Sequence, residues 1–361
     1  MAHFAWRPFR ELAETICLLG GYGDVGVRLA HLLHDNTQCR ILLAGRDGQR
    51  AQTAAVSVGE RCLGMTLDAR TPDAAARLAG VSLCVNLTEA TPPALATRLV
   101  TGGTHFIDSS ASPAYVADLR RAIGAVPVPR ASGVVETGLA PGLTNLLANH
   151  MCQTHPDIRS IDILIELGMG THHGVAATEW TLRALTQIYP MKSGGQWQNI
   201  QTGATSRSFT SAKGPILGIG FAFSDQGSIA RDLNLDGART FLAIDPGWMT
   251  RLIRWLSRSP LRNLLVAKAG MLARAMQYLP GMGGNGTRLT LEGRDAQGAL
   301  IATDRLSGGP QADMTAAVIA QAVLELLKPD SAVKNGLQTL DKLLDPTSVS
   351  ENRYAITNTG L

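Results

Sequence analysis

The feature that most constrains the fold of this chain is a glycine-rich segment near its start. An apolar run at 16–19 leads into Gly21-Tyr22-Gly23-Asp24-Val25-Gly26, and apolar residues at helical spacing follow over 25–33. In a G-x-G-x-x-G segment between a strand and a helix, the glycines allow a tight turn, admit a pyrophosphate to the backbone and let the helix pack closely on the strand. The helix N-terminus then offers unpaired N–H groups to the phosphates. We therefore expect a dinucleotide site at Gly21, Tyr22, Gly23, Asp24, Val25 and Gly26, with a purely structural glycine turn as the alternative.

The first 130 residues continue as alternating short apolar runs and helix-like stretches. Such alternation predicts a parallel sheet with right-handed crossover helices. The expected strands are 16–19, 39–44, 61–67, 81–87, 105–107 and 126–131, and the expected helices are 25–33, 49–57, 72–79, 92–100 and 114–123.

The rhythm changes after about residue 140. We predict a strand over 158–167, a helix over 176–188, a hairpin of 287–293 with 299–307, and a last helix over 314–327 that stops before Pro329. The predicted fold class is α/β. It comprises an N-terminal Rossmann domain (a doubly wound parallel sheet) at 1–140, a mixed α/β substrate domain at 141–310, and a C-terminal helical segment at 311–361 that packs back on the first domain.

Polar residues at the expected strand ends point to the identity of the cofactor. About 20 residues after the glycine segment, where an NAD site places Asp or Glu, this chain has Arg46, whose guanidinium can grip a 2′-phosphate. NADP is therefore the expected cofactor, and a solvated surface arginine is the alternative. Asp68, Asn86 and Thr88 also lie at strand ends. We expect Asp68 to contact the adenine and Asn86 or Thr88 the nicotinamide half, while each fits equally well as an ordinary turn residue.

Composition excludes several other classes of protein. With 33 basic and 29 acidic side chains the net charge is +4, which does not suggest a nucleic-acid partner. No apolar run is long enough to span a bilayer, and the first ten residues lack a secretory signal. The five cysteines show no CxxC spacing, which fits a reducing, cytoplasmic setting. No metal site is expected, since neither HExxH nor a cysteine pair accompanies the histidines.

A family resemblance extends over several segments, which are the glycine segment, Ala44-Gly45-Arg46, 85–88, 103–110 and the Pro-Gly turn of 138–145. In these segments the chain resembles saccharopine dehydrogenase-like reductases. It implies NAD(P)H-dependent hydride transfer to a carbon–nitrogen or carbonyl bond, a cofactor in the first domain and a homodimer formed through the second. Several members that act on amino acids have Asp before the Pro-Gly pair, where this chain has Ala140, so a divergent reductase of a biosynthetic intermediate is expected.

A reductase also needs a proton donor. No tyrosine is followed by lysine four residues later, which disfavours the short-chain dehydrogenase mechanism. Histidine donates protons near neutral pH, so His172 and His173, in a glycine-flanked loop, are the candidates. Glu166 and Glu179 flank this loop and could tune or replace them, and an ordinary polar surface loop is the alternative.

A long stretch without acidic residues stands apart from the cofactor motifs. From 246 to 291 there is no Asp or Glu, while six arginines and Lys268 alternate with tryptophan, leucine and methionine. The pattern is typical of amphipathic helices. They could pack on their own domain, cover a substrate pocket or contact an anionic membrane surface.

The sequence thus predicts an NADPH-dependent oxidoreductase that reduces an imine, a carbonyl or an activated alkene of a small biosynthetic intermediate. A catalytically silent nucleotide-binding scaffold or a peripheral membrane protein is the alternative.

Overall fold

The computed structural model describes residues 13–170, 175–211, 214–276, 278, 281–346 and 357–358. The chain divides into two compact units. Unit 1 comprises Met1–Leu143 and Ala312–Asn352, and unit 2 comprises Thr144–Gln311 and Arg353–Leu361. The domain limits expected at 140 and 310 stay predictions.

Unit 1 is built on a parallel sheet of seven strands in the order β15-β6-β5-β4-β1-β2-β3. The chain moves outward from β1 to β3 and then restarts beside β1 with β4, so the order reverses between β1 and β4. Such a reversal defines a doubly wound sheet. The strands are β1 (Thr15–Leu19), β2 (Arg40–Gly45), β3 (Cys62–Thr66), β4 (Leu83–Asn86), β5 (His105–Asp108), β6 (Ser132–Val134) and β15 (Gly336–Gln338).

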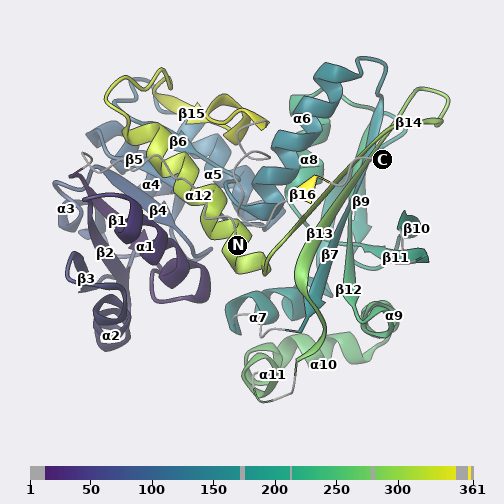
Figure 1. Ribbon diagram of the computed structural model, residues 1–361, viewed down its shortest axis with the longest axis horizontal. Helices are drawn as coiled ribbons and strands as arrows, with labels where there is room; N and C mark the ends of the chain where they lie inside the picture. Colours follow the sequence, from purple (N-terminus) through teal and green to yellow (C-terminus); the bar gives the residue numbers. More distant parts are fainter. Residues whose placement is uncertain are drawn as a thin grey trace. The chain divides into compact units, whose positions relative to one another are not determined.

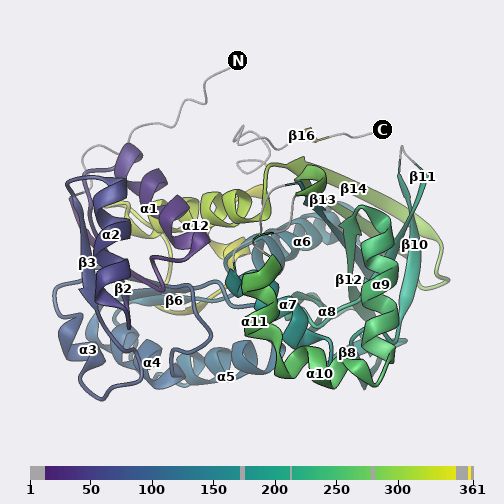
Figure 2. The same cartoon turned by 90° about the horizontal axis from the view of Figure 1, so that it is seen from below.

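Helices cover both faces of this sheet. Figure 2 shows α1, α2 and α12 on one face and α3, α4 and α5 on the other. The two layers enclose a core of buried aliphatic side chains from the strands, such as Ile16, Leu18 and Val85, none of which is exposed. The helices are α1 (Asp24–Asn36), α2 (Gly48–Val58), α3 (Ala74–Arg77), α4 (Pro93–Gly102), α5 (Pro113–Gly124) and α12 (Gln311–Leu327).

Most of the C-terminal segment, Ala312–Asn352, belongs to unit 1, whereas β16 (Thr357–Asn358) pairs with β14 (Leu300–Gly308) of unit 2. Strand β15 forms the edge of the sheet and pairs in parallel with β6 beside it (Figure 1). Helix α12 buries ten of its 17 residues and is tied to α1 by an ion pair between Asp313 and Arg28. The predicted fold class, a Rossmann domain followed by a mixed α/β domain with a returning C-terminal segment, is confirmed.

The sixth strand of the sheet differs from the prediction. The strand expected over 126–131 is wrong, because β6 is Ser132–Val134 and 126–131 forms a connection. Pro127 and Pro129 explain the difference, since proline has no N–H to donate to a ladder in the interior of a sheet.

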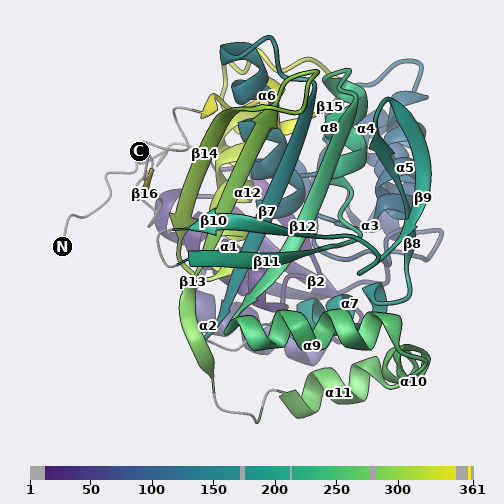
Figure 3. The same ribbon diagram turned by 90° about the vertical axis from the view of Figure 1, so that its right-hand side faces the viewer.

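Unit 2 contains a mixed sheet in the order β10-β11-β12-β7-β13-β14-β16 (Figure 3). Its central strand β7 is buried along eight of its ten residues, pairs in parallel with β12 and pairs antiparallel with β13. The predicted hairpin near residue 295 is present as the antiparallel pair β13–β14. The strands are β7 (Ser160–Met169), β10 (Ser206–Ser211), β11 (Gly214–Gly220), β12 (Gly237–Asp245), β13 (Met282–Arg294), β14 (Leu300–Gly308) and β16 (Thr357–Asn358).

The remaining elements of unit 2 are six helices and a separate hairpin among the described residues. The helix predicted over 176–188 ends earlier, at Ala184, and Ile188 already begins the first strand of the hairpin. The helices are α6 (Thr144–Thr154), α7 (Val175–Ala184), α8 (Asp225–Asp232), α9 (Gly247–Arg258), α10 (Leu261–Ala267) and α11 (Ala269–Met276), and the hairpin strands are β8 (Ile188–Ser193) and β9 (Gln196–Gln201).

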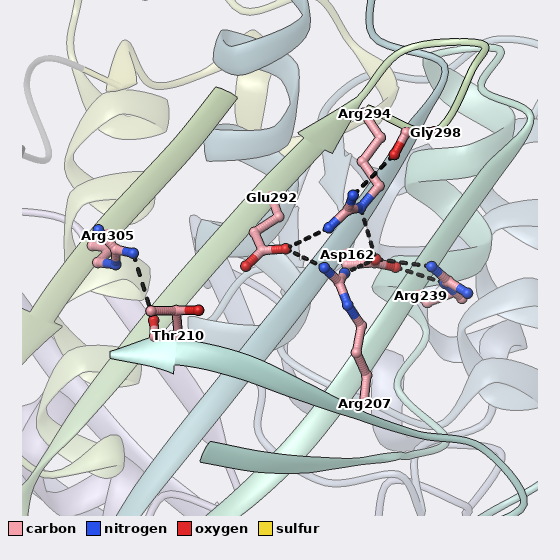
Figure 4. A network of polar contacts seen from close by, with 8 residues as sticks. All are labelled: Asp162, Arg207, Thr210, Arg239, Glu292, Arg294, Gly298 and Arg305. Atoms are coloured by element: carbon pink, nitrogen blue, oxygen red, sulfur yellow. Dashed lines mark hydrogen bonds and ion pairs between the residues drawn. The ribbon is translucent and has the colours of Figure 1, made fainter. Parts of the chain in front are cut away.

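A charged network on one face of the unit 2 sheet holds four of its strands together. Asp162 on β7 is 1% exposed and accepts a bidentate pair of hydrogen bonds from Arg239 on β12, at 2.6 and 2.8 Å. Arg207 on β10 is paired with both Asp162 and Glu292, and Arg294 donates to Glu292 at 3.0 Å (Figure 4). Asp162 is therefore the buried anion on which three arginines converge.

Replacing Asp162 by Asn should destabilise unit 2. The substitution removes the buried negative charge that faces the partly buried guanidinium groups of Arg207, Arg239 and Arg294. Breaking a fully buried ion pair from one side costs about 3–5 kcal/mol, which is an upper bound here. Urea or thermal unfolding of Asp162→Asn should show this loss, while Asp157→Asn, at an exposed position of the same unit, should unfold as the wild type does. Equal stability of the two variants would contradict a structural role for the network.

Candidate functional site

The candidate site is the edge of the unit 1 sheet at which the parallel strands end. Gly20, after β1, donates its N–H to Ala44 of β2 at 2.8 Å, and Leu87, after β4, donates to Leu19 of β1 at 2.9 Å. The ends of β1, β2 and β4 therefore lie side by side at the point where the strand order reverses. Ligands of doubly wound sheets bind at this kind of edge.

The glycine segment forms a loop that no larger residues would allow. A Cβ on Gly21 would lie 2.7 Å from the carbonyl oxygen of Leu18, and a Cβ on Gly26 would lie 2.5 Å from that of Gly21. A Cβ on Gly23 would meet only one atom within 4 Å, the carbonyl oxygen of Gly20 at 3.2 Å. Gly21 and Gly26 thus bring α1 against β1, while the position of Gly23 is open toward a ligand.

The N-terminus of α1 is a polar site without a side-chain cap. Gly23 is the N-cap residue and offers no acceptor, whereas the N-cap of α2, Asp47, accepts from the N–H of Arg50 at 3.0 Å. The carboxylate of Asp24, in the first turn of α1, accepts from Arg28 at 2.9 Å, which offsets its negative charge. The first N–H groups of α1 and its positive dipole end are therefore suited to an anion.

Two arginines follow the end of β2, and an aromatic ring from the glycine loop lies beside the second of them. The ring of Tyr22 lies over Gly45, where a Cβ would come within 2.3 Å of it, and the guanidinium of Arg50 lies 4.8 Å from the ring centre. Arg46 and Arg50 are both exposed. The sequence interpretation missed Arg50, although its position four residues after Arg46, in the first turn of α2, was available as a signal.

Asp68 and Thr88 lie at the same edge of the sheet. Asp68 follows β3 and is bound by the guanidinium of Arg70 at 2.6 and 2.9 Å, which lowers the pKa of its carboxyl group, and Arg46 lowers it further. Thr88 is partly buried, and its Cβ would lie 3.6 Å from a Cβ on Gly20. The structure thus brings together the glycine loop, Arg46, Asp68 and Thr88.

Asn86 takes part in a buried network. Its side chain is unexposed, and its amide nitrogen donates to Asp108 at 2.5 Å and to the hydroxyl of Tyr115 at 3.1 Å. Its amide oxygen accepts from the hydroxyl of Thr91 at 2.6 Å. These partners come from β5, α5 and the segment before α4, so Asn86 joins the end of β4 to three neighbouring elements.

Asp108 is the acidic centre of this network. Burial raises the pKa of its carboxyl group to about 7, although hydrogen bonds from Asn86 and from the N–H and hydroxyl of Ser110 oppose the shift. Burial also raises the pKa of Tyr115, and the neighbouring Asp108 adds to this shift. A carboxyl group with a pKa near neutrality thus lies at the end of β5, among partners within unit 1.

The segment that follows β6 has an unusual backbone at the same edge. Glu136 is 2% exposed, adopts a left-handed backbone with φ of 58°, and is paired with Arg120 of α5 at 2.7 Å. Gly142 has φ of 128°, and a Cβ there would lie 2.9 Å from the carbonyl oxygen of Glu136. The Pro-Gly turn noted in the sequence therefore folds back on Glu136, and only glycine fits at its second position.

The candidate proton donors belong to unit 2. His172 and His173 lie outside the described residues. Glu166 is paired with Arg288, which donates at 2.9 Å, and Glu179 accepts from Arg183 at 2.7 Å. Both carboxylates near the histidine loop are thus engaged by arginines. Among the residues that the structure describes, no group of three or more His, Cys, Asp or Glu is arranged to hold a metal ion.

Substituting Gly26 should show how strongly the loop restricts the fold. A Cβ at Gly26 must push the Gly21 backbone away, and such overpacking costs about 1–3 kcal/mol. Thermal unfolding should detect this loss in Gly26→Ala. Gly102→Ala is the matched control, because a Cβ at Gly102 meets nothing within 4 Å, and its melting temperature should not fall.

The buried carboxyl group of Asp108 should make unit 1 less stable as the pH rises. Its folded-state pKa of about 7 lies above that of an unfolded aspartate, so its contribution to stability is fully present below about pH 4 and is lost as the pH rises through about 7. Between these values, wild type should lose up to about 4 kcal/mol of unfolding free energy relative to Asp108→Asn. Denaturant titrations at several pH values measure this difference. A pH-independent difference would contradict the assignment, and Asp118→Asn, at a solvent-exposed position of α5, serves as the control.

Comparison with known proteins agrees with this geometry. Residues 16–126 match the model of the saccharopine dehydrogenase NADP binding domain. This segment begins in β1 and contains the glycine loop, Arg46, Asp68, Asn86 and Thr88. No protein among the curated sequences matches the chain.

Solved structures resemble the whole chain. An apo histidine-tagged saccharopine dehydrogenase (L-Glu forming) from Saccharomyces cerevisiae shares 14% identity at a TM-score of 0.64, over 95% of this chain and 98% of that one. An engineered D-amino acid dehydrogenase bound to NADP+ shares 12% identity at a TM-score of 0.44, over 94% of this chain and 96% of that one. The C. glutamicum DAP dehydrogenase in complex with DAP shares 13% identity at a TM-score of 0.44, over 93% and 95%.

The family match confirms the predicted NADP-binding domain and its cofactor, and the first of these structures confirms the predicted fold. The fold of the yeast enzyme matches nearly all of this chain. The chain is therefore an NADP-dependent oxidoreductase in which residues 16–126 form an NADP-binding domain of the saccharopine dehydrogenase type.

Proposed function

We propose that the protein is an NADPH-dependent reductase that transfers a hydride to an imine or a carbonyl group of a small biosynthetic intermediate. The observation that carries the proposal is the end of β2. There Arg46 and Arg50 are exposed beside the glycine loop. The carboxylate adjacent to Arg46 in the sequence, that of Asp47, caps the N-terminus of α2. This arrangement suits a 2′-phosphate better than a free ribose hydroxyl.

The residues at the sheet edge divide the binding of the cofactor among them. The N–H groups at the start of α1 would hold the pyrophosphate, with Gly23 leaving room for it and Gly21 and Gly26 holding the loop in place. Arg46 would grip the 2′-phosphate, and Asp68, already oriented by Arg70, would approach the adenine. Thr88 would contact the nicotinamide half.

Asn86 would act through its neighbours. Its amide is occupied by Asp108, Tyr115 and Thr91, so we assign it the role of holding the end of β4 where Thr88 begins. This role refines the expectation of a direct contact between Asn86 and the cofactor.

The chemistry requires one hydride and one proton. Bound NADPH supplies the hydride, and the chain must hold the acceptor carbon close to it and deliver the proton. We propose His172 or His173 as the donor, because imidazole exchanges protons near neutral pH. Assembly as a homodimer through the second domain and a cytoplasmic setting complete the proposal.

Replacing Arg46 should weaken NADPH selectively. Arg46→Ala removes charge-assisted hydrogen bonds to the 2′-phosphate, so NADPH should bind more weakly by about 1.5–3 kcal/mol while NADH changes little. Calorimetric titration of both cofactors measures this difference. Arg121→Ala, at an arginine with 74% of its side chain exposed on α5, should leave both affinities unchanged. An equal loss for both cofactors contradicts the role of Arg46.

Turnover separates a reductase from the silent scaffold that the sequence also allowed. Loss of NADPH absorbance across a panel of imines, ketones and unsaturated thioesters identifies a reductase and its substrate class. Tight binding of NADPH without turnover of any member of the panel would favour the scaffold. His172→Ala and His173→Ala should lower turnover without changing NADPH affinity if either histidine donates the proton.

A further inference from the structure

Helix α9 of unit 2 exposes three large apolar side chains on one face. Trp248, Leu252 and Trp255 lie at positions i, i+4 and i+7 and are 48%, 43% and 58% exposed. The fully buried residues of α9 are Thr250, 1% exposed, and Ser257, unexposed, while its other large apolar side chains, Met249, Ile253 and Leu256, are half-buried. An ordinary surface helix instead turns its apolar face inward and its polar face to solvent.

The buried polar face holds α9 in this orientation. The Thr250 hydroxyl accepts from the N–H of Ile244 at 2.7 Å and donates to the carbonyl oxygen of the same residue at 3.2 Å. Ser257 fits against Gly203, where a Cβ would lie 2.0 Å from its hydroxyl oxygen, and Arg258 donates to the carbonyl oxygens of Gly203 and Ala204 at 3.1 and 2.9 Å. Rotating the helix to bury its tryptophans would break all of these contacts.

The next two helices extend the exposed apolar surface. In α10, Leu261 and Leu264 are 47% and 59% exposed, and in α11 Met271 is 60% exposed. Figure 3 shows α9, α10 and α11 following one another along one end of unit 2. We call the set formed by Trp248, Leu252, Trp255, Leu261, Leu264 and Met271 the apolar helical surface.

Charge distinguishes this surface from a general hydrophobic patch. From 246 to 291 the sequence contains no Asp or Glu, and Arg251, Arg258, Lys268 and Arg274 are exposed on the same three helices. Glu179 on the neighbouring helix α7 brings a carboxylate close to α11. Its oxygens lie 3.4 Å from where a Cβ on Gly270 would be. This carboxylate is already bound by Arg183. Exposed cations thus border the apolar helical surface.

We propose that α9, α10 and α11 dock unit 2 on the surface of a bilayer that contains anionic lipids. Tryptophan side chains favour the interface between headgroups and acyl chains, and arginine and lysine pair with lipid phosphates. The described part of the chain contains no helix that could span a bilayer. A second copy of the chain fits less well, because a two-fold contact through this surface would place the same cations against one another.

Co-sedimentation with vesicles tests the proposal. The full-length protein should pellet with vesicles of about one third phosphatidylglycerol in phosphatidylcholine, and hardly with phosphatidylcholine alone. Raising the salt from about 0.05 to about 0.5 M should reduce the bound fraction several-fold, because screening weakens the attraction between lysine or arginine and lipid. Absence of pelleting with anionic vesicles at low salt would overturn the proposal.

Two variants separate the apolar contribution from the ionic one. Trp248→Ser combined with Trp255→Ser should weaken vesicle binding about ten-fold or more, since both rings insert into the interface. Arg251→Gln combined with Lys268→Gln should weaken binding to anionic vesicles and reduce its dependence on salt. Ile188→Ser, at an apolar residue with 68% exposure outside the apolar helical surface, is the control and should bind as the wild type does.

The outcomes remain distinct from those of the proposed function. NADPH affinity, measured by calorimetry, should be unchanged in every vesicle-binding variant, and thermal unfolding should show that unit 2 of each variant is folded. Unchanged vesicle binding of the double tryptophan variant would overturn the proposal. A wild-type dimer that dissociates in the same variant would assign the surface to a second copy and would also overturn it. Failure of NADPH binding in the wild type would affect only the proposed function.

Discussion

The close approach of α1 to β1 is the constraint on which the arrangement of unit 1 depends. Because Gly21 and Gly26 have no side chains, their backbones approach so closely that a Cβ on either would overlap a carbonyl oxygen. This contact aims the N-terminus of α1 at the end of β1, where β2 and β4 also end. The polar groups that could bind a dinucleotide, including Arg46 and Thr88, are positioned relative to that helix terminus.

Buried polar groups reinforce this edge. Asn86, Asp108 and Tyr115 satisfy one another's hydrogen bonds in the interior of unit 1, where an unpaired polar group would be costly. Their burial gives Asp108 a pKa near neutrality. The same edge thus combines exposed cations, at Arg46 and Arg50, with a buried hydrogen-bonded network around Asn86 that supports the strand ends.

Charged residues have different surroundings on the sheet of unit 2 and on helix α9. On the face of its sheet, Asp162 draws three arginines together and ties strands that are distant in the sequence. Helix α9 contains no Asp or Glu, and it buries Thr250 and Ser257 while it exposes Trp248, Leu252 and Trp255. The first arrangement stabilises the sheet internally, whereas the second leaves apolar and cationic groups available for an external contact.

The sequence by itself determined the features whose parts are neighbours in the chain. The glycine loop, the helix that follows it and Arg46 at the next strand end lie within about 30 residues, so spacing and backbone chemistry predict their geometry. It also indicated that 246–291 is amphipathic and basic. Only the tertiary structure decided which face of α9 points outward, because the periodicity of a helix contains no reference to the rest of the molecule. The tertiary structure also decided the partners of Asn86, which lie up to 29 residues away on other elements. It likewise brought Arg207, Arg239 and Arg294 together on Asp162. Both networks depend on the order of the strands, because long-range pairing is set by how the sheets assemble and not by local spacing.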